Sequence, residues 1–222
     1  GSLTYLLAQQ SRQVVAVELD TRLIASLREA LAGFTNVTIC EGDMLKLSPD
    51  VLIDAERYVV VANIPYYITS ALIRHLLEAN HKPTRMVLTV QQEVAERILA
   101  RDGKMSLLAL SVQVYGKPEL KARIPAGCFY PPPEVDSAVL SIELYQEPLV
   151  PSGSLDLFFK LAHAGFAQKR KTLRNTLATG MNESPAWAEK LLTAAGIDPQ
   201  RRAETLSMQE WIQLVEAYQE LS

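Results

Sequence analysis

The sequence of 222 residues contains little cysteine, little histidine and no long apolar run. Cys40 and Cys128 are far apart, which excludes a disulfide framework and the close cysteine spacing of a structural zinc site. The histidines are scattered without a second ligand at helical spacing, so we expect no metal site. No stretch approaches the ~20 apolar residues that cross a bilayer, and no signal peptide opens the chain. We therefore expect a cytoplasmic monomer without membrane association.

The sequence also has little net charge. A formal charge of -3 excludes an indiscriminate polyanion binder, so any contact with nucleic acid must be local. One segment, between Phe158 and Thr176, carries basic residues and no acid. We predict that its basic residues cluster at helical spacing and bind nucleic-acid phosphates through Lys169, Arg170, Lys171 and Arg174. The alternative is a solvated basic helix face, or charges that pair with acids elsewhere in the chain.

Short β-branched runs alternate with helical patterns from Leu3 to about Ala100, which predicts an α/β domain with a parallel sheet. The predicted helices are 3–9, 21–32, 69–78 and 92–100, and the predicted strands are 13–18, 37–40, 58–62 and 85–90. The strand from Val59 to Ala62 is continuously apolar, which is typical of a sheet with helices on both faces. Residues 105–115 are long enough for a helix. Strands at 120–124 and 137–144, joined by a proline-rich segment, then close the sheet.

The composition changes at residues 148–154, where prolines and a glycine are typical of a linker. Apolar positions then recur at helical spacing in four segments, 155–168, 171–179, 185–195 and 207–221. Ser207 followed by Glu210 is a capping box that marks the start of the last helix. We predict an α/β domain at 1–147, a linker at 148–154 and an all-helical domain at 155–222.

Two acidic residues stand where predicted strands end. Ligands of open α/β sheets bind beyond the carboxyl ends of the strands. The carboxylate of Glu18 can accept hydrogen bonds from the two hydroxyls of a ribose, and that of Asp43 from the exocyclic amine of an adenine ring. Each also has an ordinary structural explanation, because Glu18 neighbours a helix start and Gly42-Asp43 is a common turn.

The most specific local pattern is Asn63-Ile64-Pro65-Tyr66, directly after an apolar strand. An exocyclic adenine amine is a poor nucleophile, because its lone pair is delocalised into the ring. Hydrogen bonds from that amine to the Asn63 carbonyl and to a backbone carbonyl held rigid by Pro65 would localise the lone pair and orient it. Tyr66 would stack on the base. The alternative is a proline turn with an asparagine cap.

A second aromatic residue stands in the proline-rich segment Phe129–Pro133. Proline fixes the backbone, so this loop is expected to be stiff and to present an aromatic ring at low entropic cost. Such a ring can hold a base that has left its stack, which is worth roughly 1–3 kcal/mol. The alternative is a connector whose aromatic side chain is anchored in the core.

Together these patterns resemble the KsgA/RsmA family of ribosomal RNA adenine dimethyltransferases, which is related to the erythromycin-resistance methylases. The resemblance covers nearly the whole chain. It rests on the segments Val17–Asp20, Glu41–Met44, Asn63–Tyr67, Gln92–Arg97, Phe129–Ala138, Lys169–Asn175 and Arg202–Ser207.

The resemblance implies a Rossmann-like class I methyltransferase domain that uses S-adenosylmethionine. It implies that Glu18 holds the cofactor ribose, that Asp43 and Met44 hold its adenine, and that Asn63 contacts both the methyl group and the target base. Tyr66 and Phe129 would hold that base from its two faces. The implied reaction is dimethylation of adjacent adenines near the 3' end of small-subunit (16S) ribosomal RNA, with a role in assembly of the small ribosomal subunit.

The front of the chain departs from the family pattern. A first strand and a Gly-x-Gly-x-Gly loop are expected before Leu3, and the sequence does not contain them. Gly1 is either the last glycine of that loop, and then a cofactor contact, or part of a non-native Gly1-Ser2 pair. Because this loop would cradle the methionine end of S-adenosylmethionine, we expect this chain to bind the cofactor weakly.

Two other functions remain open at this point. One is a large-subunit RNA methylase of the macrolide-resistance type, which shares the catalytic motifs; Lys169–Asn175 and Arg202–Ser207 favour the small-subunit group. The other is a non-catalytic ribosome-assembly or nucleic-acid-binding factor built on the same fold. An intact Asn63-Ile64-Pro65-Tyr66 argues against the second alternative.

Overall fold

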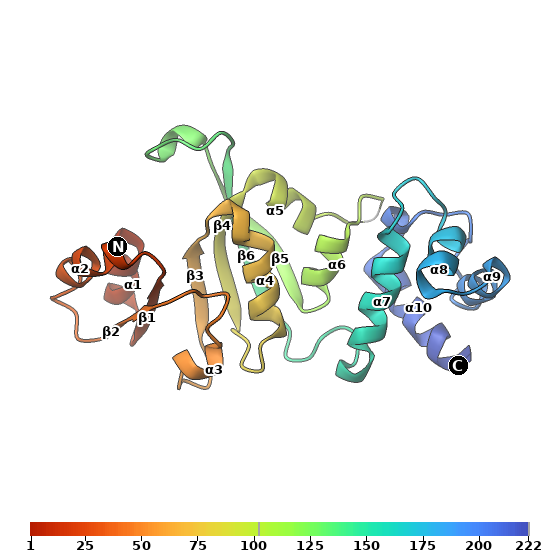
Figure 1. Ribbon diagram of the computed structural model, residues 1–222, viewed down its shortest axis with the longest axis horizontal. Helices are drawn as coiled ribbons and strands as arrows, with labels where there is room; N and C mark the ends of the chain where they lie inside the picture. The colour runs from red at the N-terminus through yellow and green to blue at the C-terminus, as the bar shows by residue number, and fades with distance from the viewer. Residues whose placement is uncertain (102, 222) are drawn as a thin grey trace. The chain divides into compact units, whose positions relative to one another are not determined.

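The computed structural model describes residues 1–101 and 103–221, and it confirms the predicted α/β class (Figure 1). The strands are β1 (Val14–Glu18), β2 (Val37–Glu41), β3 (Val59–Asn63), β4 (Arg85–Gln91), β5 (Gly116–Ile124) and β6 (Ser137–Leu144). The α-helices are α1 (Ser2–Gln10), α2 (Thr21–Ala30), α3 (Pro49–Leu52), α4 (Thr69–Glu78), α5 (Gln92–Ile98), α6 (Leu107–Gln113), α7 (Leu155–Phe166), α8 (Leu173–Met181), α9 (Pro185–Ala194) and α10 (Met208–Leu221). Short 3₁₀ helices are η1 (Tyr66–Ile68), η2 (Ala126–Cys128), η3 (Ser152–Ser154) and η4 (Ala203–Thr205).

The chain forms two compact units. The first unit contains Gly1–Tyr58 and Ala71–Lys82, and the second contains Val59–Ser70 and the described residues from Pro83 onward. Helix α4 therefore begins in the second unit and continues in the first. The division of the chain at residues 148–154 stays a prediction.

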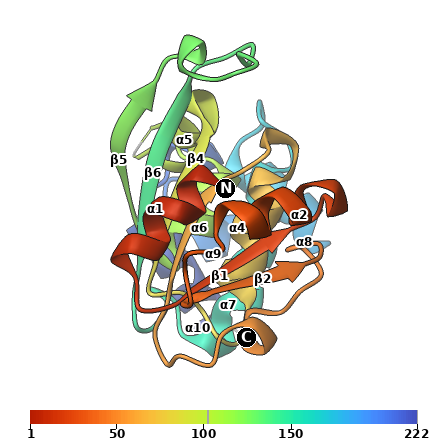
Figure 2. The same ribbon diagram turned by 90° about the vertical axis from the view of Figure 1, so that its left-hand side faces the viewer.

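The first unit is built on the parallel pair β1 and β2, whose register runs from Val14 opposite Val37 to Glu18 opposite Glu41. Figure 2 shows α1 and α2 on the same side of this pair, and both helices contact β1. The Asn36 side chain fixes the end of α1, because its amide donates to the carbonyl oxygens of Ala8 and Ser11, each at 2.9 Å. Both strands therefore end at one edge of this small sheet.

The second unit is built on a four-stranded mixed sheet in the order β3-β4-β6-β5. Strands β3 and β4 are parallel, whereas β6 runs antiparallel to both β4 and β5. Asn63, Gln91 and Ile124 therefore end their strands at the same edge where Ser137 begins β6. We call this edge the carboxyl edge. Helix α5 packs against β4, β5 and β6, and α6 packs against β5.

The C-terminal helices pack around α7, which contacts α6, α8 and α10. Small residues let α7 and α8 approach closely, because a Cβ at Gly180 would lie 2.5 Å from the Cβ of Ala164. Trp211 is fully buried, and its ring lies 5.7 Å from that of Phe166. The predicted capping box is confirmed at the start of α10, where the Ser207 N–H donates to Glu210 Oε2 at 2.7 Å and the Glu210 N–H to Ser207 Oγ at 3.2 Å.

One prediction about local structure is wrong, and one short helix was not predicted. Strand β3 is not covered on both faces, because Val59 is 53% exposed and the next three residues are half-buried. Strand β3 is an edge strand of the four-stranded sheet, where β4 is its partner. The short helix α3 was not expected from the sequence. It begins at Ser48, whose hydroxyl accepts from the Asp50 N–H at 3.3 Å, followed by Pro49.

Candidate active site

Glu18 and Asp43 follow neighbouring strands of the first unit, as the sequence predicts. The Gly42 N–H donates to the Glu18 carbonyl at 2.9 Å, which continues the pairing of β1 and β2 and brings both acids to the same edge. Glu18 Oε1 accepts from the Asp20 N–H at 2.8 Å. Within the described residues no hydrogen bond reaches Glu18 Oε2. One carboxylate oxygen is thus fixed by the backbone and the other is available to a ligand.

Asp43 is held by its own turn. Its Oδ1 accepts from the Leu45 N–H at 3.0 Å, and Lys46 Nζ lies 3.7 Å from its Oδ2. Met44 lies in this turn and is half-buried. The ordinary turn that the sequence allowed therefore exists, and it leaves the carboxylate at the end of β2 in a defined orientation.

Asp20 adds a third acid to the same part of the first unit. Its carboxylate caps α2 by accepting from the Arg22 N–H at 3.0 Å. The Arg22 side chain also donates to it, which lowers the pKa of Asp20 to about 2. Asp20 therefore stays ionised at neutral pH, two residues beyond Glu18.

Gly1 lies at the start of α1 and against α2. A Cβ at Gly1 would lie 2.8 Å from Leu27 Cδ1, and the Gly1 carbonyl accepts from the Tyr5 N–H at 2.8 Å. The residue thus stands where a side chain would press on α2. Its predicted contact with a cofactor stays a prediction.

Asn63 ends β3 at the carboxyl edge of the second unit, opposite Thr89. The next residue, Ile64, is buried, and its N–H donates to the Thr89 carbonyl at 3.3 Å. The Asn63 side chain is exposed, and within the described part of the chain it makes no hydrogen bond. The backbone is therefore anchored by Ile64 while the amide of Asn63 is left free.

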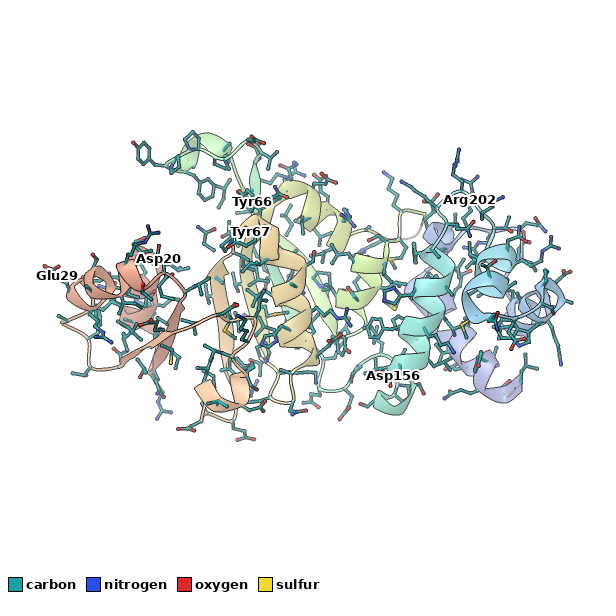
Figure 3. The ribbon with its side chains drawn as sticks, in the orientation of Figure 1. Asp20, Glu29, Tyr66, Tyr67, Asp156 and Arg202 are labelled. Carbon is teal, nitrogen blue, oxygen red and sulfur yellow. The ribbon has the colours of Figure 1, made fainter. Side chains whose placement is uncertain are left out.

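Tyr66, labelled in Figure 3, is oriented by a hydrogen bond across the carboxyl edge. Its hydroxyl lies 2.7 Å from the Ser137 Oγ, and Ser137 is fully buried at the start of β6. Pro65 immediately precedes the 3₁₀ turn η1 that carries Tyr66, and its carbonyl accepts from the Ile68 N–H at 3.1 Å. The Asn63–Tyr66 segment is therefore fixed at both of its ends.

Phe129 lies in the connector between β5 and β6, which projects beyond the carboxyl edge (Figure 1). Asp136 fixes the base of this connector, since its Oδ1 accepts from the Ala126 N–H at 2.9 Å and its carbonyl accepts from the Gln92 N–H at 3.0 Å. Phe129 itself is half-buried. The sheet register thus brings the Phe129 connector to the same edge as Asn63 and Tyr66.

The predicted site residues fall into two groups. Gly1, Glu18, Asp43 and Met44 belong to the first unit, and Asn63, Pro65, Tyr66 and Phe129 belong to the second. The strand register brings Glu18 and the Asp43 turn to one edge of the first sheet, and it brings Asn63 and the Phe129 connector to one edge of the second. Their roles toward cofactor and base stay predictions.

The predicted helical spacing of the basic cluster is wrong for three of its four residues, since only Arg174 lies in a helix, α8. Lys169, Arg170 and Lys171 lie in the turn between α7 and α8, where the Lys171 N–H donates to the Gln168 carbonyl at 3.0 Å. The break has a local cause, because Thr172 adopts an extended conformation as the N-cap of α8. All three basic side chains are exposed, and none forms an ion pair within the described residues. Arg174 differs, since its Nη1 lies 3.3 Å from Glu189 Oε2.

Other basic residues adjoin this turn in the second unit. The Leu173 N–H donates to the Arg201 carbonyl at 2.8 Å, and the Met105 N–H donates to the Glu204 carbonyl at 2.9 Å. These bonds link the turn to the segment that contains Arg202, labelled in Figure 3, and that segment to the loop before α6. We define the basic surface as the exposed side chains of Arg101, Lys104, Lys169, Arg170, Lys171 and Arg202.

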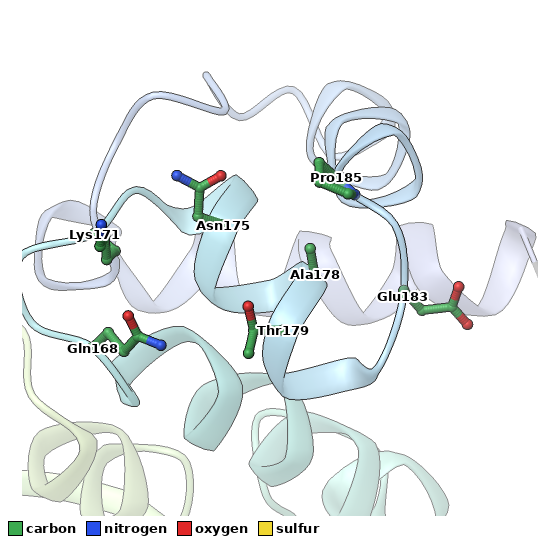
Figure 4. Close-up of a pocket in the computed structure, with 7 residues that line it drawn as sticks. All are labelled: Gln168, Lys171, Asn175, Ala178, Thr179, Glu183 and Pro185. Atoms are coloured by element: carbon green, nitrogen blue, oxygen red, sulfur yellow. The ribbon is translucent and has the colours of Figure 1, made fainter.

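A polar cavity of about 340 Å³ opens beside the basic turn (Figure 4). It lies between the end of α7, one face of α8 and the start of α9. Its lining consists of Gln168, Lys171, Asn175, Ala178, Thr179, Glu183 and Pro185. Lys171 thus belongs both to this cavity and to the basic surface.

The sequence alone did not predict that Ser137 bonds Tyr66 or that Asp136 fixes the connector between β5 and β6. Ser137 alternates with Val139, Ser141 and Glu143, a mixed pattern that gives no signal for a buried polar contact. Its partner, Tyr66, lies 71 residues away in the sequence, so the pairing itself required the structure.

Residues 1–101 and 103–221 contain no group of three or more acidic, histidine or cysteine side chains arranged to hold a metal ion. No helix in the same ranges has the length and apolar character needed to span a membrane.

Residues 1–220 match the family described as "Ribosomal RNA adenine dimethylase". The chain is 50% identical over 219 residues to "Ribosomal RNA small subunit methyltransferase A" of Dehalococcoides mccartyi (strain CBDB1), covering 98% of this chain and 75% of that protein. It is 42% identical over 223 residues to the protein of the same name from Moorella thermoacetica, covering 95% of this chain and 77% of that protein.

Two solved structures share the fold. The crystal structure of the 23S rRNA methyltransferase ErmE matches with a TM-score of 0.78 and 28% identity, over 98% of this chain and 86% of that one. The crystal structure of a dimethyladenosine transferase from Plasmodium falciparum matches with a TM-score of 0.82 and 24% identity, over 99% of this chain and 86% of that one.

The hydrogen bond between Tyr66 and Ser137 generates a prediction on stability. Tyr66→Phe should lower the free energy of unfolding by about 1–3 kcal/mol, because the buried Ser137 hydroxyl loses its partner. Ser137→Ala should also destabilise, but the double variant should lose less than the sum of the two. Urea unfolding followed by the fluorescence of Trp187 and Trp211 measures these values. Tyr145→Phe is the matched control, and strictly additive effects would contradict a bond between the two side chains.

Proposed function

The chain belongs to the ribosomal RNA adenine dimethylase family, and from this membership we propose that it dimethylates adjacent adenines near the 3' end of small-subunit ribosomal RNA. The chain is an adenine methyltransferase of ribosomal RNA, and S-adenosylmethionine is its methyl donor. The finer assignment to the small subunit is supported by the relatives at 42–50% identity, which carry the name small subunit methyltransferase A. The large-subunit alternative has weaker support, because ErmE is 28% identical.

One observation carries the catalytic proposal: Asn63 presents an exposed, unpaired amide at the carboxyl edge, on a backbone that Ile64 anchors. Its side-chain carbonyl accepts one hydrogen of the target amine. A second acceptor is needed for the other hydrogen. The Pro65 carbonyl is already used by the Ile68 N–H, whereas the Ile64 carbonyl makes no such bond within the described residues, so we assign it as that acceptor. Two acceptors orient the amine and localise its lone pair toward the incoming methyl group.

Tyr66 and Phe129 hold the base in this proposal. The bond to Ser137 fixes the ring of Tyr66, so little rotational freedom is lost when a base stacks on it. Phe129 reaches the base from the connector that Asp136 fixes at the same edge. Extruding the target adenine costs the stacking energy with its neighbouring bases, and stacking on these two rings offsets that cost.

Glu18, Asp43, Met44 and Gly1 are the proposed cofactor residues. The hydrogen-bonding groups of these residues fit an adenosine ligand. Glu18 has a carboxylate oxygen that can accept from ribose hydroxyls, and the oriented carboxylate of Asp43 can accept from an adenine amine. Bound S-adenosylmethionine would supply the electrophilic methyl group. The task of these residues is to bind and orient the adenosine end.

The basic surface is the proposed docking site for RNA in the assembling small ribosomal subunit. Its exposed side chains lie on three segments that backbone hydrogen bonds hold together. Arg174 contributes less than Lys169, Arg170 and Lys171 in this proposal, since its ion pair with Glu189 would have to be broken or shared.

The catalytic proposal predicts that Asn63→Ala abolishes methyl transfer and leaves cofactor binding largely intact. The reason is that Asn63 contacts the reacting amine and makes no internal hydrogen bond that the fold would lose. Transfer of a labelled methyl group to undermethylated small-subunit particles measures the first effect, and calorimetry with S-adenosylmethionine the second. The protein made from its complete gene serves for both measurements, with the exposed Asn80→Ala as the control. A variant that retains most of its turnover would refute the role of Asn63.

The docking proposal predicts a change in salt dependence. Replacing Lys169, Arg170 and Lys171 by alanine should weaken binding to small-subunit particles and reduce the slope of log affinity against log salt by roughly 0.7–0.9 for each lost phosphate contact. Binding across a salt series, with the exposed Lys190→Ala as the control, measures the slope. Unchanged affinity with an unchanged slope would mean that Lys169, Arg170 and Lys171 do not contact phosphates. The next candidates are then Arg97 and two other residues of the basic surface, Arg101 and Lys104.

A further inference from the structure

Two tyrosine side chains of the second unit are almost entirely in water. Tyr130 is 100% exposed and Tyr67 is 84% exposed, whereas Tyr145, at the opposite end of β6, is 40% exposed. Neither Tyr67 nor Tyr130 makes a hydrogen bond or ring contact within the described residues. Fully exposed aromatic rings of this size are unusual without a binding partner, because burying such a ring is strongly favourable.

Both rings belong to segments that leave the carboxyl edge. Tyr67 follows Tyr66 in the 3₁₀ turn η1, where successive side chains point about 120° apart. Since the hydroxyl of Tyr66 is bound to Ser137, Tyr67 is directed away from the sheet, and Figure 3 shows it beside Tyr66 at this end of the unit. Tyr130 follows Phe129 in the connector that leaves the same edge.

The backbone that carries each ring is constrained. The turn of Tyr67 is closed by the hydrogen bond from the Ile68 N–H to the Pro65 carbonyl. Tyr130 is followed by three prolines, and the base of its connector is fixed by Asp136. A ring that is exposed but attached to a constrained backbone loses little entropy when it binds a flat ligand.

The neighbouring chemistry indicates what that ligand is. The same edge carries the proposed amine acceptor Asn63, and the same unit carries the basic surface. When a target adenine is extruded, the bases on either side of it lose a stacking neighbour. Exposed aromatic rings replace such contacts in proteins that bind unpaired RNA.

We infer that Tyr67 and Tyr130 are stacking subsites for the unpaired nucleobases that flank the target adenine, one base on each ring. This inference rests on the proposed adenine methylation. The aromatic residues near the carboxyl edge then have two different roles, according to their burial. The half-buried Tyr66 and Phe129 hold the target base, and the exposed Tyr67 and Tyr130 position the RNA strand on either side of it.

The test compares ring-removing and ring-keeping variants in steady-state methyl transfer to undermethylated small-subunit particles. Tyr67→Ala and Tyr130→Ala should each raise KM for the particles about 5- to 150-fold, which corresponds to ~1–3 kcal/mol of stacking at ~1.4 kcal/mol per tenfold. The value of kcat at saturating RNA should change much less, because neither ring contacts the reacting amine. Tyr67→Phe and Tyr130→Phe should restore KM, since stacking needs the ring and not the hydroxyl. Tyr130→Leu should not restore it, because leucine is apolar but not flat.

Tyr145→Ala is the matched control, an exposed tyrosine away from the carboxyl edge, and its KM should equal that of the unmodified protein. The double variant Tyr67→Ala/Tyr130→Ala should show multiplied effects on KM if the rings hold different bases. An unchanged KM in both single alanine variants, or full rescue by leucine, would overturn the inference while methylation by the unmodified protein still stood. Absence of adenine methylation by the unmodified protein would instead refute the proposed function.

Discussion

The pairing of β4 with β3 on one side and β6 on the other is the interaction on which the second unit depends. Its register places Asn63 opposite Thr89 and Ser137 opposite Gln91, so that the end of β3 and the start of β6 meet at one edge. A shift of either pair by one residue would turn every side chain of that strand to the other face of the sheet. Asn63, the bond between Tyr66 and Ser137, and the connector of Phe129 all take their positions from this pairing.

The proposed chemistry at that edge needs a rigid frame and a surface that binds a large polyanion, and we assign both to the second unit. The buried Ile64 anchors the backbone beside Asn63. The buried Ser137 fixes the ring of Tyr66 through its hydrogen bond to the Tyr66 hydroxyl. The side chains of the basic surface, by contrast, lie in loops and turns and form no ion pair within the described residues. The proposed catalytic groups are thus attached to the sheet, whereas the groups proposed to contact phosphates are exposed outside the strands and helices.

The sequence predicted most elements of the fold because their signals are local. Helix α4 and strand β6 have the predicted bounds, and Ser207 and Glu210 form the predicted capping box. One error arose where distant contacts decide the outcome, because the apolar pattern of β3 says nothing of its edge position. A second error was local. The basic residues were expected at helical spacing, but Lys169, Arg170 and Lys171 lie in a turn that ends at Thr172, the N-cap of α8. The site motifs were found from their chemistry, but the contact of Tyr66 with Ser137 joins segments far apart in sequence.

The most direct test of the central claim is the identity of the modified nucleoside. Undermethylated small and large ribosomal subunits would be incubated separately with the protein and S-adenosylmethionine, and their RNA digested and analysed by mass spectrometry. The account predicts N6,N6-dimethyladenosine in the small-subunit RNA, within one fragment near its 3' end, and none in the large-subunit RNA. Dimethyladenosine confined to large-subunit RNA, or no methylated adenine in either, would contradict it.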